Sequence, residues 1–334
     1  AHNTVVAAGA SASVPPAGGA GEKNIGQVEL VGMEPLPGEN VVSPYCSFTN
    51  TAYFDSSTNT RQLRSLAIIR TSPETGYYVD IYRSGNAVSN DYVYHNIGET
   101  FAFFDENDVP LSMESAEYPT TGEDYPGFRF LSDVEKIENY TLPLKGIFSA
   151  KDREGNDIYM QVSIPASSDK TYYSARSLPV KTAGPQYRKK KLPLFTIRTE
   201  EEAWSEPFVV VYEPWCASKK PTVTRVERVA DLCNEENTVL RIQHKDGSEQ
   251  FIFQGNDVNS SVENDQMRFA GLLGVITLNP AGELVRLYLG EGKHISWGNV
   301  VMTSGDVTAS SEVELKPGNS FTVTGNQAVT IRVE

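Results

Sequence analysis

Residues 238–254 read TVLRIQHKDGSEQFIFQ. Two runs rich in Val, Ile, Leu and Phe, Thr238–Gln243 and Gln250–Gln254, flank the polar residues Lys245–Ser248. The Asp-Gly pair within these polar residues supplies the positive φ that a tight hairpin needs. The stretch therefore predicts two antiparallel strands joined by a short turn.

The same pattern of two β runs around a turn recurs along the chain. It is found at Leu272–Leu278 with Leu284–Leu289, and at Phe321–Thr324 with Ala328–Val333. Ile158–Ile164 alternates apolar and polar residues at a period of two, which is typical of a strand with one buried face. Helical periodicity is scarce: only Val226–Leu232 and Ser132–Tyr140 suggest short helices. We therefore predict an all-β chain.

The chain divides at a short polar link. Phe208–Tyr212 (FVVVY) is apolar on both faces, which suits a strand buried between two layers. Residues 217–221 (ASKKP) form a short polar link, and clear hairpin patterns follow it. We predict a large, supersandwich-like β-sandwich over residues 1–217, with a flexible Ala/Gly/Pro loop at 8–26, and a smaller C-terminal β-sandwich module over 221–334.

The charge balance excludes some classes of partner. The chain has 334 residues, with 29 Lys and Arg against 43 Asp and Glu, for a net charge of −14. Nucleic-acid binding calls for a basic footprint, so a nucleic-acid partner is not expected. No apolar run approaches the ~18 residues of a membrane span. An anionic ligand would have to be held by a local basic patch.

One such patch is visible in the sequence. Arg188-Lys189-Lys190-Lys191 is the only dense cationic cluster in this acidic chain. Guanidinium and ammonium groups at this density can bind a sulfate or a carboxylate. The alternative is a solvated surface loop.

Four histidines offer candidates for site chemistry. His244 and His294 lie in expected turns and are predicted to be exposed. His95 ends an aromatic strand, and Asp80 interrupts another apolar strand, where a charge must face water or be paired. With His2, these residues would form a two-histidine, one-carboxylate set suited to zinc. Alternatively, Asp80 pairs with a nearby arginine, Arg70 or Arg83.

Several segments resemble heparinase II/III-like polysaccharide lyases. The opening residues 1–6 (AHNTVV) are similar to the HNTV strand of the β domain of that family. Arg64–Arg83 and Asn90–Gly98 (NDYVYHNIG) are similar to two segments that follow it, and Pro207–Pro214 to a later core strand. The resemblance covers much of the first 215 or so residues, and HNTV and DYVYHNIG are its most specific parts.

The resemblance implies a fold and an activity. Such enzymes carry an N-terminal α/α toroid before their β-sandwich domains. They cleave uronic-acid polysaccharides by β-elimination: a base removes the proton beside the carboxylate, the carbanion is neutralised, and an acid protonates the leaving oxygen. Most of the catalytic groups lie in the toroid. The β sheet contributes histidine and, in several members, a structural zinc.

Carried over to this chain, the resemblance places His2 in the catalytic cleft or at the zinc, with Asp80 and His95 as further zinc ligands. Arg188–Lys191 would contact an acidic polysaccharide. The chain lacks the toroid, so we expect it to be inactive alone and to need this helical domain of the parent protein. A bacterial periplasmic or secreted location is implied. The alternative is a non-catalytic carbohydrate-binding or scaffold module.

Overall fold

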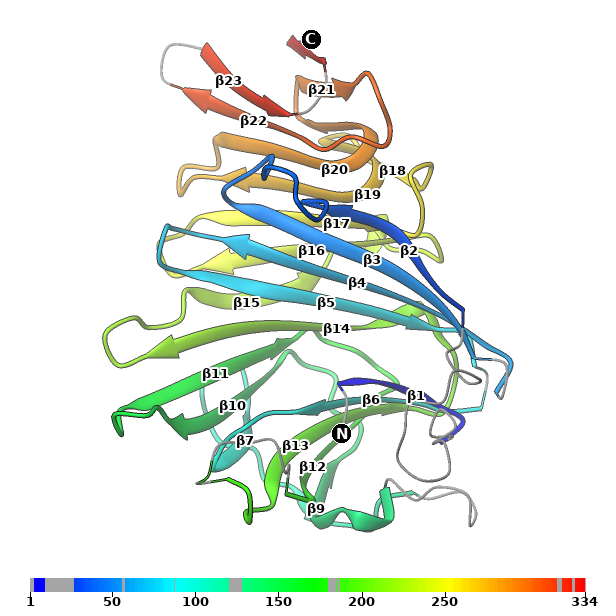
Figure 1. The fold of residues 1–334 in the computed structure, drawn as a ribbon, viewed down its shortest axis with the longest axis vertical. Coiled ribbons are helices and arrows are strands. Elements are labelled where there is room, and N and C mark those ends of the chain that lie inside the picture. The colour runs from blue at the N-terminus through cyan, green and yellow to red at the C-terminus, as the bar shows by residue number, and fades with distance from the viewer. Residues whose placement is uncertain are drawn as a thin grey trace. The chain divides into compact units, whose positions relative to one another are not determined.

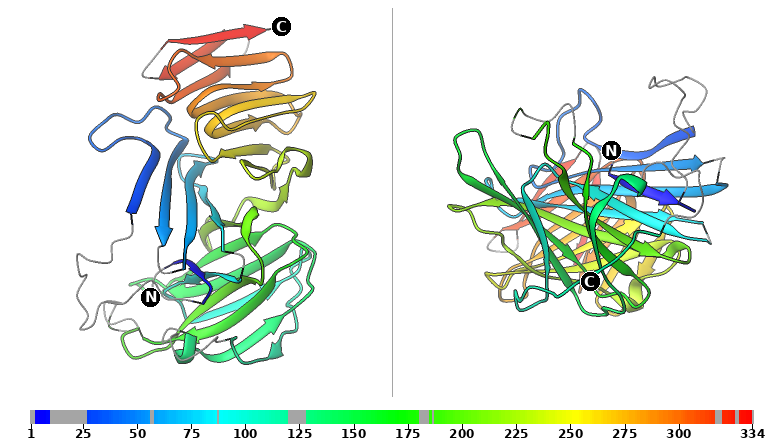
Figure 2. Two further views of the ribbon diagram at one scale, coloured as in Figure 1. Left: turned by 90° about the vertical axis from the view of Figure 1, so that its right-hand side faces the viewer. Right: turned by 90° about the horizontal axis from the view of Figure 1, so that it is seen from below.

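A computed structural model describes residues 3–9, 27–55, 58–86, 88–119, 128–179, 185, 187–316, 320–325 and 328–333. These residues fold almost entirely into antiparallel strands (Figures 1 and 2). Within them there is no α-helix, only the 3-10 turns η1 (Phe128–Phe130) and η2 (Ala230–Leu232). None of these described segments is a helix with the length and apolarity to cross a bilayer. The all-β fold is confirmed.

The described strands form three sheets. The first has the order β1 (Thr4–Ala7), β6 (Asn90–His95), β13 (Leu192–Thr199), β12 (Thr171–Ser177), β9 (Ser132–Ile137), β8 (Glu114–Ser115). The second has the order β2 (Gln27–Glu34), β3 (Cys46–Asp55), β4 (Thr60–Arg70), β5 (Gly76–Ser84), β14 (Ala203–Cys216), β11 (Asp157–Ile164), β10 (Leu144–Lys151), β7 (Thr100–Phe104).

The third sheet belongs to the C-terminal part of the chain. Its order is β15 (Val223–Arg228), β16 (Asn237–His244), β17 (Glu249–Gly255), β19 (Met267–Leu278), β20 (Leu284–Trp297), β21 (Val300–Ser304), β24 (Val329–Val333). The strands β18 (Ser261–Glu263), β22 (Ser311–Lys316) and β23 (Ser320–Gly325) pair at its margins. The hairpin expected over 238–254 is present, with Gln243 opposite Glu249.

The chain forms two compact units. Unit 1 comprises residues 1–28, 53–62 and 82–221, and unit 2 comprises 29–52, 63–81 and 222–334. The expected division into residues 1–217 and 221–334 stays a prediction. The expected loop at 8–26 falls almost wholly on residues 10–26, which lie outside the described ones.

The core of unit 1 is dominated by aromatic side chains from both of its sheets. Phe195 of β13 is fully buried, and its ring lies 5.4–6.2 Å from five other aromatic rings. Phe208 to Tyr212 of β14 are all buried, as their apolar pattern predicts. A core of this kind holds the two layers of a sandwich together, because both faces of the interior strands are removed from water.

The core of unit 2 centres on the third sheet. Phe253 and Phe269, on β17 and β19, are fully buried with ring centroids 5.2 Å apart. Gly274 lies opposite Leu289, and a Cβ there would come within 2.7 Å of the Phe269 ring. Glycine is therefore required at this position to let the aromatic ring lie against the strand.

The two expected short helices are absent. Ser132–Ile137 forms strand β9, and Val223–Arg228 forms strand β15, followed by the single turn η2. In β9, exposed and half-buried residues alternate along the strand, which pairs with β12 on one side. Cross-strand pairing has overridden a weak local helical signal.

Candidate functional site

A cavity of about 280 Å³ opens on unit 1. Its walls come from strands β7, β8, β9, β12 and β13 and from neighbouring residues, and include Phe101, Asp133, Glu135, Arg176 and Pro193. The lining thus combines an aromatic ring, a guanidinium group and two carboxylates. We call it the unit-1 cavity.

The basic cluster Arg188–Lys191 lies next to this cavity. Arg176, a wall residue, donates through Nη1 to the carbonyl oxygen of Lys191 at 3.3 Å. Lys191 Nζ donates to Ser132 Oγ at 2.7 Å, beside the wall residue Asp133. The backbone carbonyl oxygen and the side-chain ammonium group of Lys191 therefore both connect the cluster to the region of the cavity.

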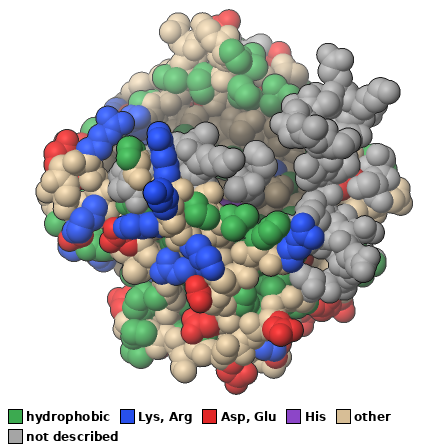
Figure 3. Space-filling model, turned by 60° about the horizontal axis from the view of Figure 1, so that its bottom comes forward, with side chains coloured by type: hydrophobic (Ala, Val, Ile, Leu, Met, Phe, Trp, Pro, Cys, Tyr) green, Lys and Arg blue, Asp and Glu red, His purple; other side chains and the backbone are tan. Residues whose placement is uncertain are grey.

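The cationic side chains of the cluster are exposed. Arg188, Lys189, Lys190 and Lys191 all face solvent at the turn that precedes β13. Lys190 makes a long ion pair of 3.4 Å with Glu99. Lys and Arg side chains gather on the face shown in Figure 3. An exposed group of this kind can attract an anionic polymer although the chain as a whole is acidic, because screening makes local charges dominate.

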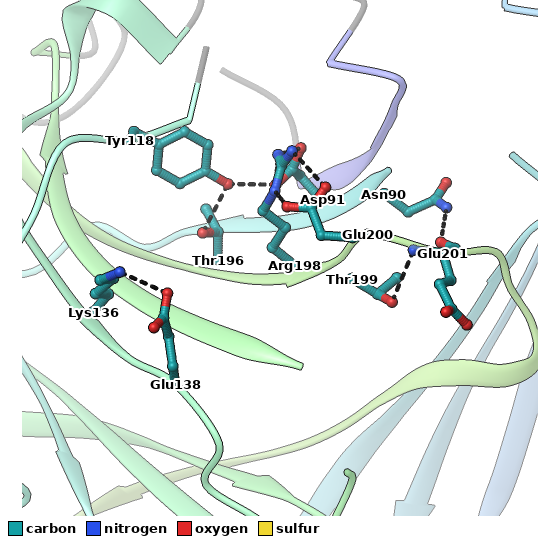
Figure 4. Close-up of polar contacts among 10 residues, drawn as sticks. All are labelled: Asn90, Asp91, Tyr118, Lys136, Glu138, Thr196, Arg198, Thr199, Glu200 and Glu201. Atoms are coloured by element: carbon teal, nitrogen blue, oxygen red, sulfur yellow. Dashed lines mark hydrogen bonds and ion pairs between the residues drawn. The ribbon is translucent and has the colours of Figure 1, made fainter. Parts of the chain in front are cut away.

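A buried ion-pair network lies between β6 and β13 of the same sheet (Figure 4). Asp91 and Arg198 are register partners, and Arg198 Nη1 donates to the two oxygens of Asp91 at 3.0 and 2.9 Å. Tyr118 donates its hydroxyl proton to Asp91 Oδ1 at 2.6 Å and also lies 3.0 Å from Thr196 Oγ1. Arg198 Nε donates to Glu200 at 2.6 Å.

Burial controls the acid–base behaviour of this network. Burial raises the pKa of Asp91, although the charge of Arg198 and the hydrogen bond from Tyr118 oppose the rise. Burial, with the Asp91 charge added, raises the pKa of Tyr118 well above its usual range. In this arrangement the hydroxyl of Tyr118 stabilises the buried carboxylate of Asp91 by donating a hydrogen bond to it.

The structure gives Asp80 a partner that the sequence did not. Arg64 binds Asp80 in a bidentate manner, with Nε to Oδ1 at 3.0 Å and Nη2 to Oδ2 at 2.6 Å. The Asp80 side chain is 1% exposed and that of Arg64 is 24% exposed. Asp80 is therefore a buried charge that is paired, and Arg64 is a partner that the sequence analysis did not consider. Arg83 donates to the backbone carbonyl oxygen of Trp204.

The described residues leave the expected zinc set untested. His2 lies outside them. His95 is half-buried, and its backbone N–H donates to Asn3 Oδ1 at 2.7 Å. Both oxygens of Asp80 accept hydrogen bonds from Arg64. Among the residues that the structure describes, no group of three His, Cys, Asp or Glu side chains is placed to hold a metal.

The expectation for His244 is wrong. This side chain is buried, and its Nε2 lies 3.0 Å from Gln250 Oε1, which also accepts the hydroxyl proton of Tyr77 at 2.7 Å. The histidine is the last residue of β16, directly before the expected turn, and neighbouring side chains of unit 2 cover it. The expectation for His294 is also wrong, because it lies within strand β20 rather than in a turn and is half-buried; burial lowers its pKa.

Comparison with known proteins points to polysaccharide lyases. Residues 223–314 match the family described as endo-acting ulvan lyase C-terminal domain. The chain is also similar to a particular enzyme, the endo-acting ulvan lyase of Formosa agariphila, with 29% identity over 326 residues. That alignment covers 93% of this chain and 39% of the relative, so the chain spans well under half of that protein's length.

Proposed function

We propose that this chain is the β portion of a polysaccharide lyase that acts on uronic-acid-containing glycans by β-elimination. The observation that carries the proposal is the similarity to an endo-acting ulvan lyase along nearly the whole chain. The basic cluster beside the unit-1 cavity supports it, because an acidic glycan needs cations for binding. The finer assignment, to the heparinase II/III-like group, rests on the HNTV and DYVYHNIG segments.

In this proposal the chain's own residues bind and orient the glycan. Arg188 to Lys191 attract its carboxylates, and Arg176 gives the adjoining cavity a cation in its wall. His2, if it enters the cleft, would act as an acid–base group. The remaining base, acid and carbanion-neutralising groups come from a helical segment of the parent protein, so the isolated chain is expected to be inactive. Polysaccharide cleavage would place the parent protein in the periplasm or outside the cell.

The test is a lyase assay on the full-length parent protein and on residues 1–334 alone. We expect the parent to release an unsaturated product from ulvan or a related uronic-acid glycan, followed by its ultraviolet absorbance. The isolated chain should release none, because loss of catalytic groups costs many orders of magnitude in rate. Turnover by the isolated chain would contradict the proposal that the catalytic groups lie in a helical segment of the parent protein. An inactive parent protein would contradict the proposed function.

Neutralising the basic cluster is expected to weaken glycan binding. In an Arg188→Gln, Lys189→Gln chain, each lost exposed charge should reduce affinity for ulvan oligosaccharides roughly twofold to fivefold. Calorimetry at low and at high salt measures this, and the difference from wild type should shrink as salt screens the charges.

The matched control removes two exposed cations from unit 2, Lys245→Gln with Lys293→Gln. It changes the net charge by the same amount and should leave the affinity within about twofold. Equal losses in both double variants would mean that only net charge matters and that the cluster is a solvated loop.

The second candidate function is a non-catalytic glycan-binding module. The observation that favours it is the family match at residues 223–314, which falls in a C-terminal domain. It predicts glycan binding by residues 1–334 together with a parent protein that cleaves no uronic-acid glycan.

Zinc is proposed at His2, Asp80 and His95 only on the strength of the resemblance. Metal analysis of the purified chain is the test, with His2→Ala and Asp80→Asn as variants. Stoichiometric zinc that is lost in both variants would support the site. A metal-free chain would leave Asp80 as the partner of Arg64.

A further inference from the structure

A second cavity, of about 620 Å³, opens on the third sheet of unit 2. Its volume lies within the ~300–1,000 Å³ usual for small-ligand sites. The residues around it come from β15, β16, β17, β19 and β20 and the adjoining turns, all within residues 227–297. We call it the β15–β20 groove.

The floor of this groove is apolar and aromatic. Phe251 and Trp297 have ring centroids 5.3 Å apart and planes inclined by 35°, and Met267 and Leu278 lie beside them. Phe251 is buried, whereas Trp297 is half-buried and keeps some surface exposed to solvent. A half-exposed indole in a concavity offers a flat apolar face for a ligand to cover.

The rim of the groove carries planar polar side chains. Arg241 binds Glu249 in a bidentate manner, with Nη2 to Oε1 at 2.5 Å and Nε to Oε2 at 3.1 Å. Its Nη1 lies 3.9 Å from Glu227 Oε2. Gln266 also lines the groove and is exposed. Arg241 and Glu249 hold each other in place, so they present donors and acceptors at set positions.

The net charge of the rim determines whether the groove favours an anionic or a neutral ligand. The lining contains two arginines, Arg228 and Arg241, and two glutamates, Glu227 and Glu249, so the formal charges cancel. Burial alone would raise the pKa of Glu249, but hydrogen bonds from Arg241 and Gln243 and the charge of Arg241 outweigh it and lower this pKa, so the pair stays ionised. A balanced rim does not favour an anion over a neutral ligand.

We propose that the β15–β20 groove is a saccharide subsite that holds one sugar through its hydroxyl groups and its C–H face. Pairs of neighbouring hydroxyls match the fixed donors and acceptors of carboxylates, guanidinium groups and amides. The C–H face of the ring covers the open face of Trp297, which removes apolar surface from water. The proposal rests on the proposed glycan function and adds a subsite that is separate in chemistry from the basic cluster of unit 1.

The two glycan-binding regions are distinguished by salt. Binding at Arg188–Lys191 should weaken as salt is raised, because it depends on unscreened charge. Binding at the groove should change little, because stacking and hydrogen bonding to hydroxyls do not depend on net charge. The chain has three tryptophans, and Trp204 and Trp215 lie outside the groove.

The experiment uses residues 1–334 carrying Trp204→Phe and Trp215→Phe, so that Trp297 is the sole indole. Ulvan oligosaccharides are titrated in at high salt, and the Trp297 fluorescence is followed. We expect a saturable change whose midpoint shifts less than about twofold between low and high salt. In parallel, calorimetry at high salt on the otherwise native chain should show about tenfold weaker binding for Trp297→Ala and a smaller loss for Trp297→Phe.

Gln266→Ala provides a second variant should Trp297→Ala not fold, because Gln266 is exposed and its removal leaves the backbone hydrogen bonds of this turn in place. It should weaken binding roughly threefold. A flat fluorescence titration, or unchanged affinity in both Trp297→Ala and Gln266→Ala, would overturn the subsite. A parent protein that cleaves ulvan while the groove binds nothing would overturn the subsite and leave the proposed function standing. Saccharide binding in the groove together with an inactive parent protein would support the subsite and overturn the proposed function.

Discussion

Replacing Arg198 by Leu is expected to lower the free energy of unfolding by about 3–5 kcal/mol, the usual cost of removing one partner from a buried ion pair. Asp91 has no exposed surface, and Arg198 donates to both of its oxygens. Without the guanidinium, the carboxylate would lose its charged partner in a place that water does not reach. The Tyr118 hydroxyl would remain as a donor to Oδ1, which compensates only in part.

The same variant should have a characteristic dependence on pH. Burial already raises the pKa of Asp91 in the folded chain, and loss of Arg198 raises it further. A carboxyl group with a raised folded pKa binds its proton more tightly in the folded than in the unfolded state. The variant should therefore be least stable at high pH and regain stability as pH falls through the folded pKa toward the unfolded value of about 3.9.

Chemical denaturation at several pH values measures both effects. Tyr118→Phe, which removes one hydrogen bond and no charge, should cost only about 1 kcal/mol. Asp91→Leu with Arg198→Leu should cost less than the sum of the two single changes, because no charge is left behind. An Arg198→Leu chain within about 1 kcal/mol of wild type would show that the pair carries little stability.

The strand pattern was predictable, whereas the charge pairs were not. Alternation and turn residues identified the 238–254 hairpin, because both are local properties of the chain. Asp80 was recognisable as a buried charge within an apolar strand, but its partner depends on the register between neighbouring strands. Arg64 could be chosen over Arg70 or Arg83 only once that register was known.

The candidate site shows the same limit. Arg188–Lys191 is contiguous in sequence and was therefore visible as a cluster. Asp91 lies within the DYVYHNIG segment, where His95 drew attention, and its partner Arg198 is more than a hundred residues away. The β15–β20 groove draws Phe251 and Trp297 from different strands, so no local motif marks it.

The second large effect is expected for Phe195→Ala. This side chain is fully buried and is the ring that the other aromatic side chains of unit 1 surround. Truncating a buried phenylalanine to alanine costs about 3–5 kcal/mol, through lost burial and the cavity that remains. Phe195→Leu keeps most of the volume and should cost considerably less. Trp204 and Trp215 report on the unfolding of unit 1, and Trp297 reports on unit 2.

Phe195 also ties stability to the proposed glycan site. Its ring stacks 5.4 Å from that of Phe101, which forms part of the wall of the unit-1 cavity. Phe195→Ala should therefore loosen that wall and weaken salt-dependent oligosaccharide binding in the chains that remain folded. The matched control is Phe253→Ala, an equal truncation of a fully buried ring in unit 2. It should destabilise by a similar amount and leave the salt-dependent binding unchanged. If Phe195→Ala and Phe253→Ala change the salt-dependent binding equally, the unit-1 cavity takes no part in glycan recognition. Phe195 would then contribute only to the stability of the core.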